Sequence, residues 1–315
     1  MSAAPATREL ERCLVCGQQR WQSLPLRYEW QGLSFPAVEC PVCAMRFLSV
    51  QPAGETLARM YSAEYFERDF RCGRSEQHSF DEAAFRAENT GLLDRFERYR
   101  GGGRLLEVGC ASGWLLKHAA ERGWRVTGVE LSGEAAAHAR GLGLDVRQGA
   151  LEDVELPADG FDLVYMGDVL EHVPDCRAAV ARVRDVLAPG GHFFLRGPIT
   201  THSLARGLAM NACAWVGRDL VLREPPYHLW EFTPASLRRL MRRVGLEVVA
   251  LEQAKIPPGR AHGDKTALQR AAMAAIDAVN VPITRAFNAL GDRVVMVARR
   301  PAVRGADSRT APRNA

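Results

Sequence analysis

The sequence predicts an α/β fold with a doubly wound, mostly parallel sheet of seven strands and a small separate unit at the N-terminus. Short apolar runs alternate with amphipathic helical stretches from Arg104 onward, which is the pattern of repeated strand–helix units. A turn of small residues, Gly109 to Gly113, directly follows the first apolar run. Four of the eight cysteines lie in the first 50 residues, which indicates that this part is organised differently from the sheet.

Most of the predicted strands are short apolar runs, as expected where a parallel sheet is buried on both faces, and the strand predicted at residues 144–148 is weaker. Helices are predicted at residues 112–123, 132–143 and 175–190, the last of them ending on Gly190. The strands are predicted at residues 104–108, 125–131, 144–148, 161–166, 192–197, 246–253 and 292–300.

The chain divides into four predicted parts. Residues 1–50 form the cysteine-rich unit, residues 51–100 a helical, aromatic cap or linker, and residues 101–300 the α/β domain. Within that domain residues 253–290 form a helical insertion, whose Ala-rich helix is expected to break at Pro282. The tail, residues 301–315, is polar and lacks periodicity, so it is expected to be disordered.

Composition narrows the function classes. A chain of 315 residues with 47% hydrophobic side chains can fill the core of a domain of this size. Arg206 and Arg218 interrupt the longest apolar candidate for a membrane span, and the first residues lack the apolar core of a signal peptide. We therefore expect a cytoplasmic protein, with peripheral membrane contact left open. The net charge of +4 is too modest to indicate nucleic-acid binding.

The cysteines of the N-terminal unit form two C-x2-C pairs, Cys13 with Cys16 and Cys40 with Cys43, separated by 23 residues. Two thiolates on a tight turn supply half of a tetrahedral zinc site, and two such turns complete it. A cytosolic chain argues against disulfides. The spacing therefore predicts one structural zinc ion (Zn2+) in a zinc ribbon, with a chance arrangement of structural cysteines as the alternative.

Ligands of doubly wound sheets bind beyond the carboxyl ends of the strands. Gly109, Ala111 and Gly113 follow the first strand with G-x-A-x-G spacing, which differs from the G-x-G-x-x-G of dinucleotide-binding loops. Their small side chains let the backbone approach a ligand, and the N-terminus of the next helix favours an anionic group. Glu130 ends the second strand, placed to accept hydrogen bonds from a ribose diol, and Gly167 follows the fourth. These features predict a nucleoside-binding cleft.

The ordered motifs resemble those of the class I S-adenosylmethionine-dependent methyltransferases, which have a Rossmann-like fold. The matching stretches are EVGCASG, VEL, FDLVYMGDVLEHV and LAPGG, at residues 107–113, 129–131, 161–173 and 187–191. The resemblance implies that the cofactor is S-adenosyl-L-methionine and that the backbone around Gly109, Ala111 and Gly113 faces its methionine moiety. It implies further contacts at the strand ends: the amino group at Glu107, the ribose at Glu130, the adenine at Leu131 and Glu152, and the open edge at Gly167.

A zinc ribbon before such a domain resembles the zinc-ribbon sugar methyltransferases and their relatives in polysaccharide or natural-product pathways. The resemblance implies a small-molecule acceptor, namely a hydroxyl or carbon of a sugar, nucleotide-sugar, glycolipid or natural product. In the carbon-methylating members a segment Y-H-E-H-x-x-Y-F-S carries the base, and its second histidine falls on His228 here. Its tyrosine and glutamate fall on Pro225 and Tyr227, so methylation of oxygen and of carbon both remain open.

Methyl transfer needs alignment of the acceptor with the sulfonium and exclusion of water, and an acceptor hydroxyl also needs a base. His228 is the first candidate, because it precedes a predicted helix and lies among aromatic residues. His172, in the LEHV stretch near the cleft mouth, is the second. A packing role is the alternative for both.

The predicted helix at residues 237–245 places four arginines on its outer face: Arg238, Arg239, Arg242 and Arg243. They could meet a phosphate-bearing acceptor or form a solvated face. Residues 202–217 are expected to cover the acceptor pocket. Two rival functions remain, an RNA methyltransferase whose ribbon binds nucleic acid and a catalytically silent protein that binds S-adenosylmethionine. The first 50 residues carry only five arginines against four acids, so a nucleic-acid partner is not expected.

Overall fold

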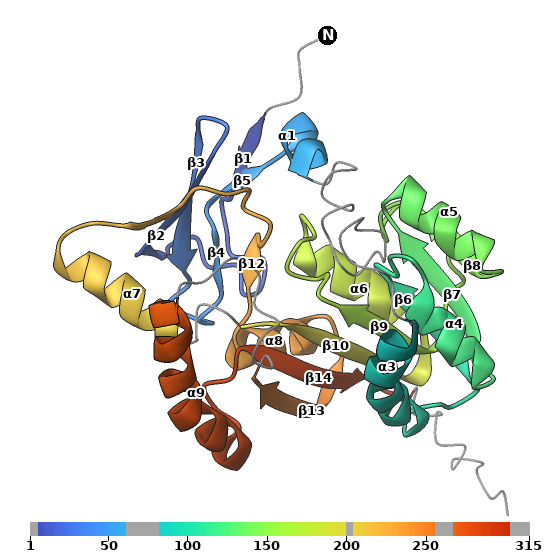
Figure 1. Ribbon diagram of the computed structural model, residues 1–315. Helices are drawn as coiled ribbons and strands as arrows, with labels where there is room; N and C mark the ends of the chain where they lie inside the picture. The colour runs from blue at the N-terminus through green and yellow to red at the C-terminus, as the bar shows by residue number, and fades with distance from the viewer. Residues whose placement is uncertain (1–5, 61–81, 200–203, 256–266, 303–315) are drawn as a thin grey trace, which may run out of the picture.

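The computed structural model describes residues 6–60, 82–199, 204–255 and 267–302. Its largest element is a seven-stranded sheet with the order β13-β14-β10-β9-β6-β7-β8 (Figure 1). The five strands from β10 to β8 in this order are parallel, whereas β14 is antiparallel to both of its neighbours. The predicted doubly wound, mostly parallel sheet is therefore confirmed. The strands are β6 (Arg104–Val108), β7 (Arg125–Glu130), β8 (Asp145–Gln148), β9 (Phe161–Gly167), β10 (Leu187–Pro198), β13 (Glu247–Ala254) and β14 (Arg293–Arg299).

Helices cover both faces of this sheet, because side chains along each strand alternate between two apolar cores. Leu105 and Leu163 belong to the core that also contains residues of α3 (Glu82–Glu97), α4 (Trp114–Glu121) and α5 (Gly133–Gly141). Leu106 and Val164, one residue further along the same strands, belong to the core beneath α6 (Cys176–Val186) and α8 (Pro234–Arg243). All four side chains are fully buried. Burial on both faces explains why these strands are continuous apolar runs in the sequence.

The N-terminal unit is a five-stranded sheet with the order β11-β2-β3-β4-β12, accompanied by an antiparallel pair, β1 (Thr7–Glu9) and β5 (Val50–Pro52). β2 (Gln22–Trp30), β3 (Leu33–Glu39) and β4 (Arg46–Leu48) come from the first 50 residues. β11 (Leu220–Leu222) and β12 (Trp230–Glu231) come from the segment between β10 and α8. The sequence did not indicate these two strands, because they are only three and two residues long. The chain therefore returns to the N-terminal sheet after β10.

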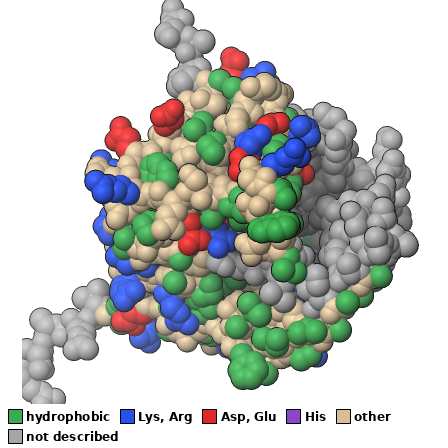
Figure 2. All heavy atoms as spheres, turned by 90° about the vertical axis from the view of Figure 1, so that its left-hand side faces the viewer, with side chains coloured by type: hydrophobic (Ala, Val, Ile, Leu, Met, Phe, Trp, Pro, Cys, Tyr) green, Lys and Arg blue, Asp and Glu red, His purple; other side chains and the backbone are tan. Residues whose placement is uncertain are grey.

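The described residues contain three further helices: α1 (Gly54–Met60), α7 (Leu204–Trp215) and α9 (Ala267–Phe287). α7 packs against β2, β11 and α9. Exposed large apolar side chains on these helices are Leu208 and Trp215 on α7, and Val279 and Phe287 on α9. Figure 2 turns this side of the molecule toward the viewer and shows apolar side chains gathered in the lower part of the face. Exposed apolar surface of this kind is typical of contact with another molecule.

Two details of the helix predictions were wrong. Helix α6 ends at Val186 rather than Gly190, and Leu187 already pairs with Phe161 as the first residue of β10. Pro189 explains the early end, because a proline disfavours helical backbone in the residue before it. Helix α9 runs through Pro282 without a break. A proline removes one backbone hydrogen bond from a helix, and the turns on either side of it can continue.

Some predictions concern residues that the structure does not describe. These are the aromatic part of the predicted linker (61–81), the start of the segment expected to cover the acceptor pocket (202–203), part of the helical insertion (256–266) and most of the polar tail (303–315). Within the described residues, no helix combines the length and apolar character needed to cross a bilayer.

Candidate functional site

The turn after β6 is folded tightly against its neighbours. Gly109 and Gly113 have positive φ angles of 72° and 82°, a region that favours glycine. A Cβ at Gly109 would lie 2.5 Å from Cγ2 of Val169, and a Cβ at Gly113 would lie 2.7 Å from that of Ala139. Ala111, between them, also has a positive φ of 47°. Small residues are therefore required to hold this turn at the carboxyl edge of β6.

Glu130 ties the turn to the next strand. It ends β7, is buried, and accepts a hydrogen bond from the backbone N–H of Ala111 at Oε2 and from that of Ser132 at Oε1, both at 2.8 Å. Ser132 in turn caps α5, because its side chain accepts a hydrogen bond from the N–H of Ala135. Each carboxylate oxygen can accept more than one hydrogen bond. The carboxylate can therefore hold the turn and accept from ligand hydroxyls as well.

Glu107 is the second buried carboxyl group at this edge. It lies on β6, and its Oε2 has no hydrogen-bond partner among the described residues. Burial raises the pKa of Glu107 well above its usual range, and the charge of Glu130 raises it further, whereas Arg196 opposes the rise. Buried polar atoms normally have a hydrogen-bond partner. An atom of this kind fits a ligand that brings N–H donors and a positive charge, such as the amino group of an amino acid.

The remaining predicted cofactor residues are distributed around the same edge. Leu131 follows Glu130 and is 56% exposed, so its side chain is available to pack on a flat ring. Gly167 ends β9, where a Cβ would lie 2.2 Å from the hydroxyl oxygen of Tyr165. Glu152 is exposed in the turn that follows β8. The contacts of these residues with a cofactor stay predictions.

An ion-pair network at the carboxyl end of β9 was not indicated by the sequence. Asp168 has a positive φ of 59° and a side chain that is only 7% exposed. Its carboxylate contacts Arg293 of β14 and lies 3.7 Å from Nη2 of Arg196 on β10. No local pattern signals these contacts, because they depend on the antiparallel register that sets Arg293 opposite Pro198. The network therefore joins β10 and β14 to the residue that directly follows β9.

The structure brings the two predicted histidines together. The rings of His172 and His228 have centroids 5.0 Å apart and an interplanar angle of 74°. Nδ1 of His172 lies 2.8 Å from the carbonyl oxygen of Tyr227. Because a carbonyl can only accept, Nδ1 carries the proton of this bond. Nε2 then faces the buried carboxylate of Glu171, 3.9 Å away.

Glu171 was not singled out in the sequence. One ligand atom from each of Glu171, His172 and His228 lies within 4.8 Å of the other two. A carboxylate and two imidazoles at this spacing can pass a proton between them or hold a metal ion.

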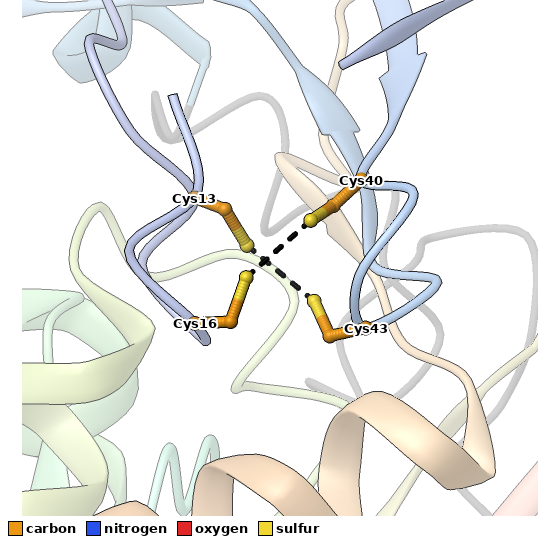
Figure 3. A group of neighbouring side chains, drawn as sticks. All are labelled: Cys13, Cys16, Cys40 and Cys43. Carbon is orange, nitrogen blue, oxygen red and sulfur yellow. Dashed lines mark hydrogen bonds between the residues drawn. The ribbon is translucent and has the colours of Figure 1, made fainter. Parts of the chain in front are cut away.

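The four predicted zinc ligands converge in the N-terminal unit (Figure 3). Sγ of Cys13 lies 3.6 Å from that of Cys43, and Sγ of Cys16 lies 3.4 Å from that of Cys40. Zinc–sulfur bonds of about 2.3 Å place the sulfurs of a tetrahedral site about 3.8 Å apart, so this group fits a zinc ion. The hydrogen bond from Cys43 is the largest effect that lowers the pKa of Cys13 to about 5.

Both cysteine turns have the same backbone geometry. The N–H of Gly17 donates to the carbonyl of Cys13, and the N–H of Ala44 donates to the carbonyl of Cys40. Gly17 and Ala44 both have positive φ angles, of 83° and 54°. We call these two turns, residues 13–17 and 40–44, the knuckles. Their similarity supports a shared role in holding one ion.

Two of the four arginines on α8 bind the knuckles. Nη1 of Arg239 donates to the carbonyl of Val42 at 3.3 Å, and Nη1 of Arg243 donates to that of Cys16 at 2.9 Å. Arg238 and Arg242 are exposed. The basic face of this helix therefore serves in part to attach the N-terminal unit to the α/β domain.

Comparison with known proteins agrees with the fold. A solved SAM-dependent methyltransferase from Archaeoglobus fulgidus has a TM-score of 0.50 and 18% identity, and the match covers 76% of this chain and 100% of that chain. At this identity the likeness shows a shared fold.

Two bacterial relatives are each named ubiquinone biosynthesis O-methyltransferase. The protein from Xanthomonas euvesicatoria pv. vesicatoria is 35% identical over 158 residues, which are 47% of this chain and 64% of that protein. The protein from Xylella fastidiosa strain M23 is 33% identical over 178 residues, which are 53% of this chain and 70% of that protein. The match to the Xanthomonas relative thus spans less than two thirds of that protein's length.

The family model described as a methyltransferase domain matches residues 80–251, more than half of the chain. The matched region contains the turn after β6, Glu130, His172 and His228, and it excludes the cysteine unit. The predicted resemblance to S-adenosylmethionine-dependent methyltransferases is therefore confirmed: the chain belongs to the methyltransferase domain family. The resemblance to the zinc-ribbon sugar methyltransferases stays a prediction.

Proposed function

We propose that this protein transfers a methyl group from S-adenosylmethionine to a hydroxyl of a small-molecule acceptor. The observation that carries the proposal is the pair of buried carboxyl groups at the carboxyl edge of β6 and β7. Glu130 can still accept from ligand hydroxyls, and Oε2 of Glu107 has no donor among the described residues. A ribose diol and an amino group are the two features that S-adenosylmethionine would bring to these positions.

The bound cofactor would supply an electrophilic methyl group on a sulfonium. The chain's own residues would bind and orient it: the backbone of Gly109, Ala111 and Gly113 at the methionine moiety, and Leu131 on the adenine. Gly167 would leave the edge of β9 open, and Glu152 would flank the adenine from the turn after β8. The main contribution of the protein to the rate would be to align the acceptor with the methyl group and the sulfur, and to exclude water from them.

An oxygen acceptor is favoured over a carbon acceptor for two reasons. Two similar proteins are named O-methyltransferases. The base-bearing segment of the carbon-methylating sugar enzymes also has a tyrosine and a glutamate where this chain has Pro225 and Tyr227. The acceptor would be a sugar, a glycolipid or a natural product on the strength of the ribbon resemblance alone.

His228 is the proposed base, with His172 beside it. His228 would accept the proton of the acceptor hydroxyl. Its ring contacts that of His172, which lies close to the end of β9. The hydrogen bond from Nδ1 of His172 to the carbonyl oxygen of Tyr227 fixes the orientation of the His172 ring. Glu171, next to Nε2 of His172, would stabilise a positive charge on the histidine pair.

The RNA-methyltransferase alternative receives little support from the arginines of α8. Arg239 and Arg243 already donate to the backbone of the knuckles, which reduces the charge available for phosphates. A catalytically silent S-adenosylmethionine-binding protein is the other alternative. Cofactor affinity without transfer to any acceptor would support it.

For the cysteine group we propose one structural zinc ion held by Cys13, Cys16, Cys40 and Cys43. Four sulfurs complete the tetrahedron and leave no position for a catalytic water. The ion would contribute to the folding of the N-terminal unit. A reducing compartment such as the cytoplasm would keep these thiols available.

The first test concerns Glu130. Glu130→Ala should weaken S-adenosylmethionine binding by about 1–3 kcal/mol, the scale for losing hydrogen bonds to a charged group. Isothermal titration calorimetry measures the change, and Glu247→Ala, at an exposed carboxylate on the edge strand β13, is the matched control that should bind normally. Unchanged affinity in the Glu130 variant, or binding of a nicotinamide dinucleotide instead, would refute the cofactor assignment.

The second test concerns the metal. Elemental analysis of protein purified without chelators should find one zinc per chain, and Cys40→Ser should lower that content, because a three-thiolate site binds zinc more weakly. Cys213→Ser, at a half-buried cysteine on α7, should keep the full content. The absence of zinc from the parent protein, or full zinc content in Cys40→Ser, would rule the site out.

The third test concerns the base. Once an acceptor is identified, His228→Ala should lower turnover by roughly a hundred- to ten-thousand-fold, the usual contribution of general-base catalysis, with S-adenosylmethionine affinity unchanged. His172→Ala should lower turnover less, and His192→Ala, in the middle of β10 and away from its carboxyl end, should have no effect. Near-normal turnover in His228→Ala would remove this residue from the mechanism, and a large loss of cofactor affinity would make it structural.

A further inference from the structure

His228 lies in a short segment that is held from two sides, and we call residues 227–231 the His228 segment. On one side this segment belongs to the N-terminal sheet. β12 pairs antiparallel with β4, so that Trp230 is opposite Phe47, and the N–H of Leu48 donates to the carbonyl of Leu229 at 3.2 Å. The rings of Phe47 and Trp230 lie 5.9 Å apart.

On the other side the His228 segment is bound to the turn that follows β9. The N–H of Leu229 donates to the carbonyl of Glu171 at 2.9 Å, and the indole N–H of Trp230 donates to that of Val173 at 2.6 Å. Leu229 and Trp230 are 0% and 1% exposed. The position of His228 against His172 therefore depends on β4 as well as on the sheet edge that carries the cofactor residues.

Strand β4 is a direct continuation of the second knuckle. The N–H of Cys40 donates to the carbonyl of Met45 at 2.8 Å, which closes the knuckle immediately before Arg46, the first residue of β4. Nε of Arg46 donates to Glu39 at 2.6 Å, so a side-chain bond also spans the knuckle from its entry to its exit. The geometry of this turn thus sets where β4 begins.

The chain after the His228 segment returns to the same knuckles. Thr233 caps α8 in a capping box with Ser236 directly after β12, and Arg239 and Arg243 on that helix bind the knuckle carbonyls. Hydrogen bonds thus connect these elements in a closed circuit, from the second knuckle through β4, β12 and α8 back to the knuckles. Loosening the knuckles would therefore loosen every contact that holds the ribbon side of His228.

We propose that the four-cysteine centre acts as a positioning element for His228. Ion binding orders the knuckles, the second knuckle fixes β4, and β4 holds the His228 segment against His172 and Glu171. Phe47 and Leu48 are the positioning residues of this arrangement. Only the purpose of the arrangement rests on the proposed function, because the mechanical coupling can be measured without a substrate.

Hydrogen exchange of the full chain, with zinc and after chelation, tests the coupling directly. The N–H of Leu48 reports the bond between β4 and the segment, and the N–H of Leu229 reports the bond to the turn after β9. Both should exchange roughly tenfold faster or more after zinc removal, whereas the amides of β6 should keep their protection. Faster exchange confined to the knuckle amides Gly17 and Ala44, with Leu48 and Leu229 unchanged, would overturn the proposal.

A variant that keeps all four cysteines covers the case in which chelation unfolds the whole chain. Phe47→Ala removes the ring packed on Trp230, and Phe35→Ala makes an equal truncation on β3, at a residue that is also fully buried. Phe47→Ala should retain zinc, speed exchange at Leu229 and, once an acceptor is known, lower kcat with cofactor affinity unchanged. Equal exchange at Leu229 in the two variants would overturn the proposal.

The two proposals fail in different ways. If no acceptor is methylated but the amides of Leu48 and Leu229 respond to zinc, the coupling stands and the catalytic role of His228 falls. If His228→Ala abolishes turnover but these amides do not respond to zinc, the proposed function stands and the positioning role of the cysteine centre falls.

Discussion

Two buried carboxyl groups on neighbouring strands constrain the rest of this site. β6 and β7 pair in parallel with Val108 opposite Val129, which brings Glu107 and Glu130 to the same edge. Buried charges are costly unless they are paired or hydrogen-bonded. Glu130 is stabilised by two backbone donors, but Glu107 has a raised pKa because it is buried beside that charge. A ligand that offers hydroxyls to Glu130 and a cation to Glu107 would relieve this cost. The small residues of the tight turn let the backbone approach such a ligand.

The N-terminal unit is integrated with the α/β domain rather than attached to it by a linker. A single apolar core contains Val15 and Phe35 of this unit together with Val180 of α6 and Leu240 of α8. Two strands of the N-terminal sheet also come from the segment between β10 and α8. His228 lies next to one of these strands, β12. The segment that carries His228 therefore contacts both the N-terminal sheet and the turn after β9. Under the proposed positioning role, the cysteine centre would affect catalysis through this shared strand.

Much of the α/β domain could be predicted because its signals are local. The buried runs at 104–108 and 161–166 are strands whose side chains are covered on both faces of the sheet. The G-x-A-x-G turn directly follows its strand, and Glu130 is the last residue of its own. The contacts that could not be predicted are set by distant pairings. Arg293 reaches Asp168 through the register of β14, Arg239 reaches Val42 across 197 residues, and β12 is too short to show any periodicity. Glu171 could not be predicted as part of the site, because only the return of the chain after β10 brings His228 close to it.

A crystal structure of the zinc-loaded protein with S-adenosylhomocysteine, the product of methyl transfer, would test the central claim most directly. We expect the ribose hydroxyls on Glu130, the amino group on Oε2 of Glu107, and the sulfur on the side of the site that carries His172 and His228. A nucleoside bound elsewhere on the molecule would contradict it. So would a nucleoside bound at this edge with Oε2 of Glu107 still lacking a donor.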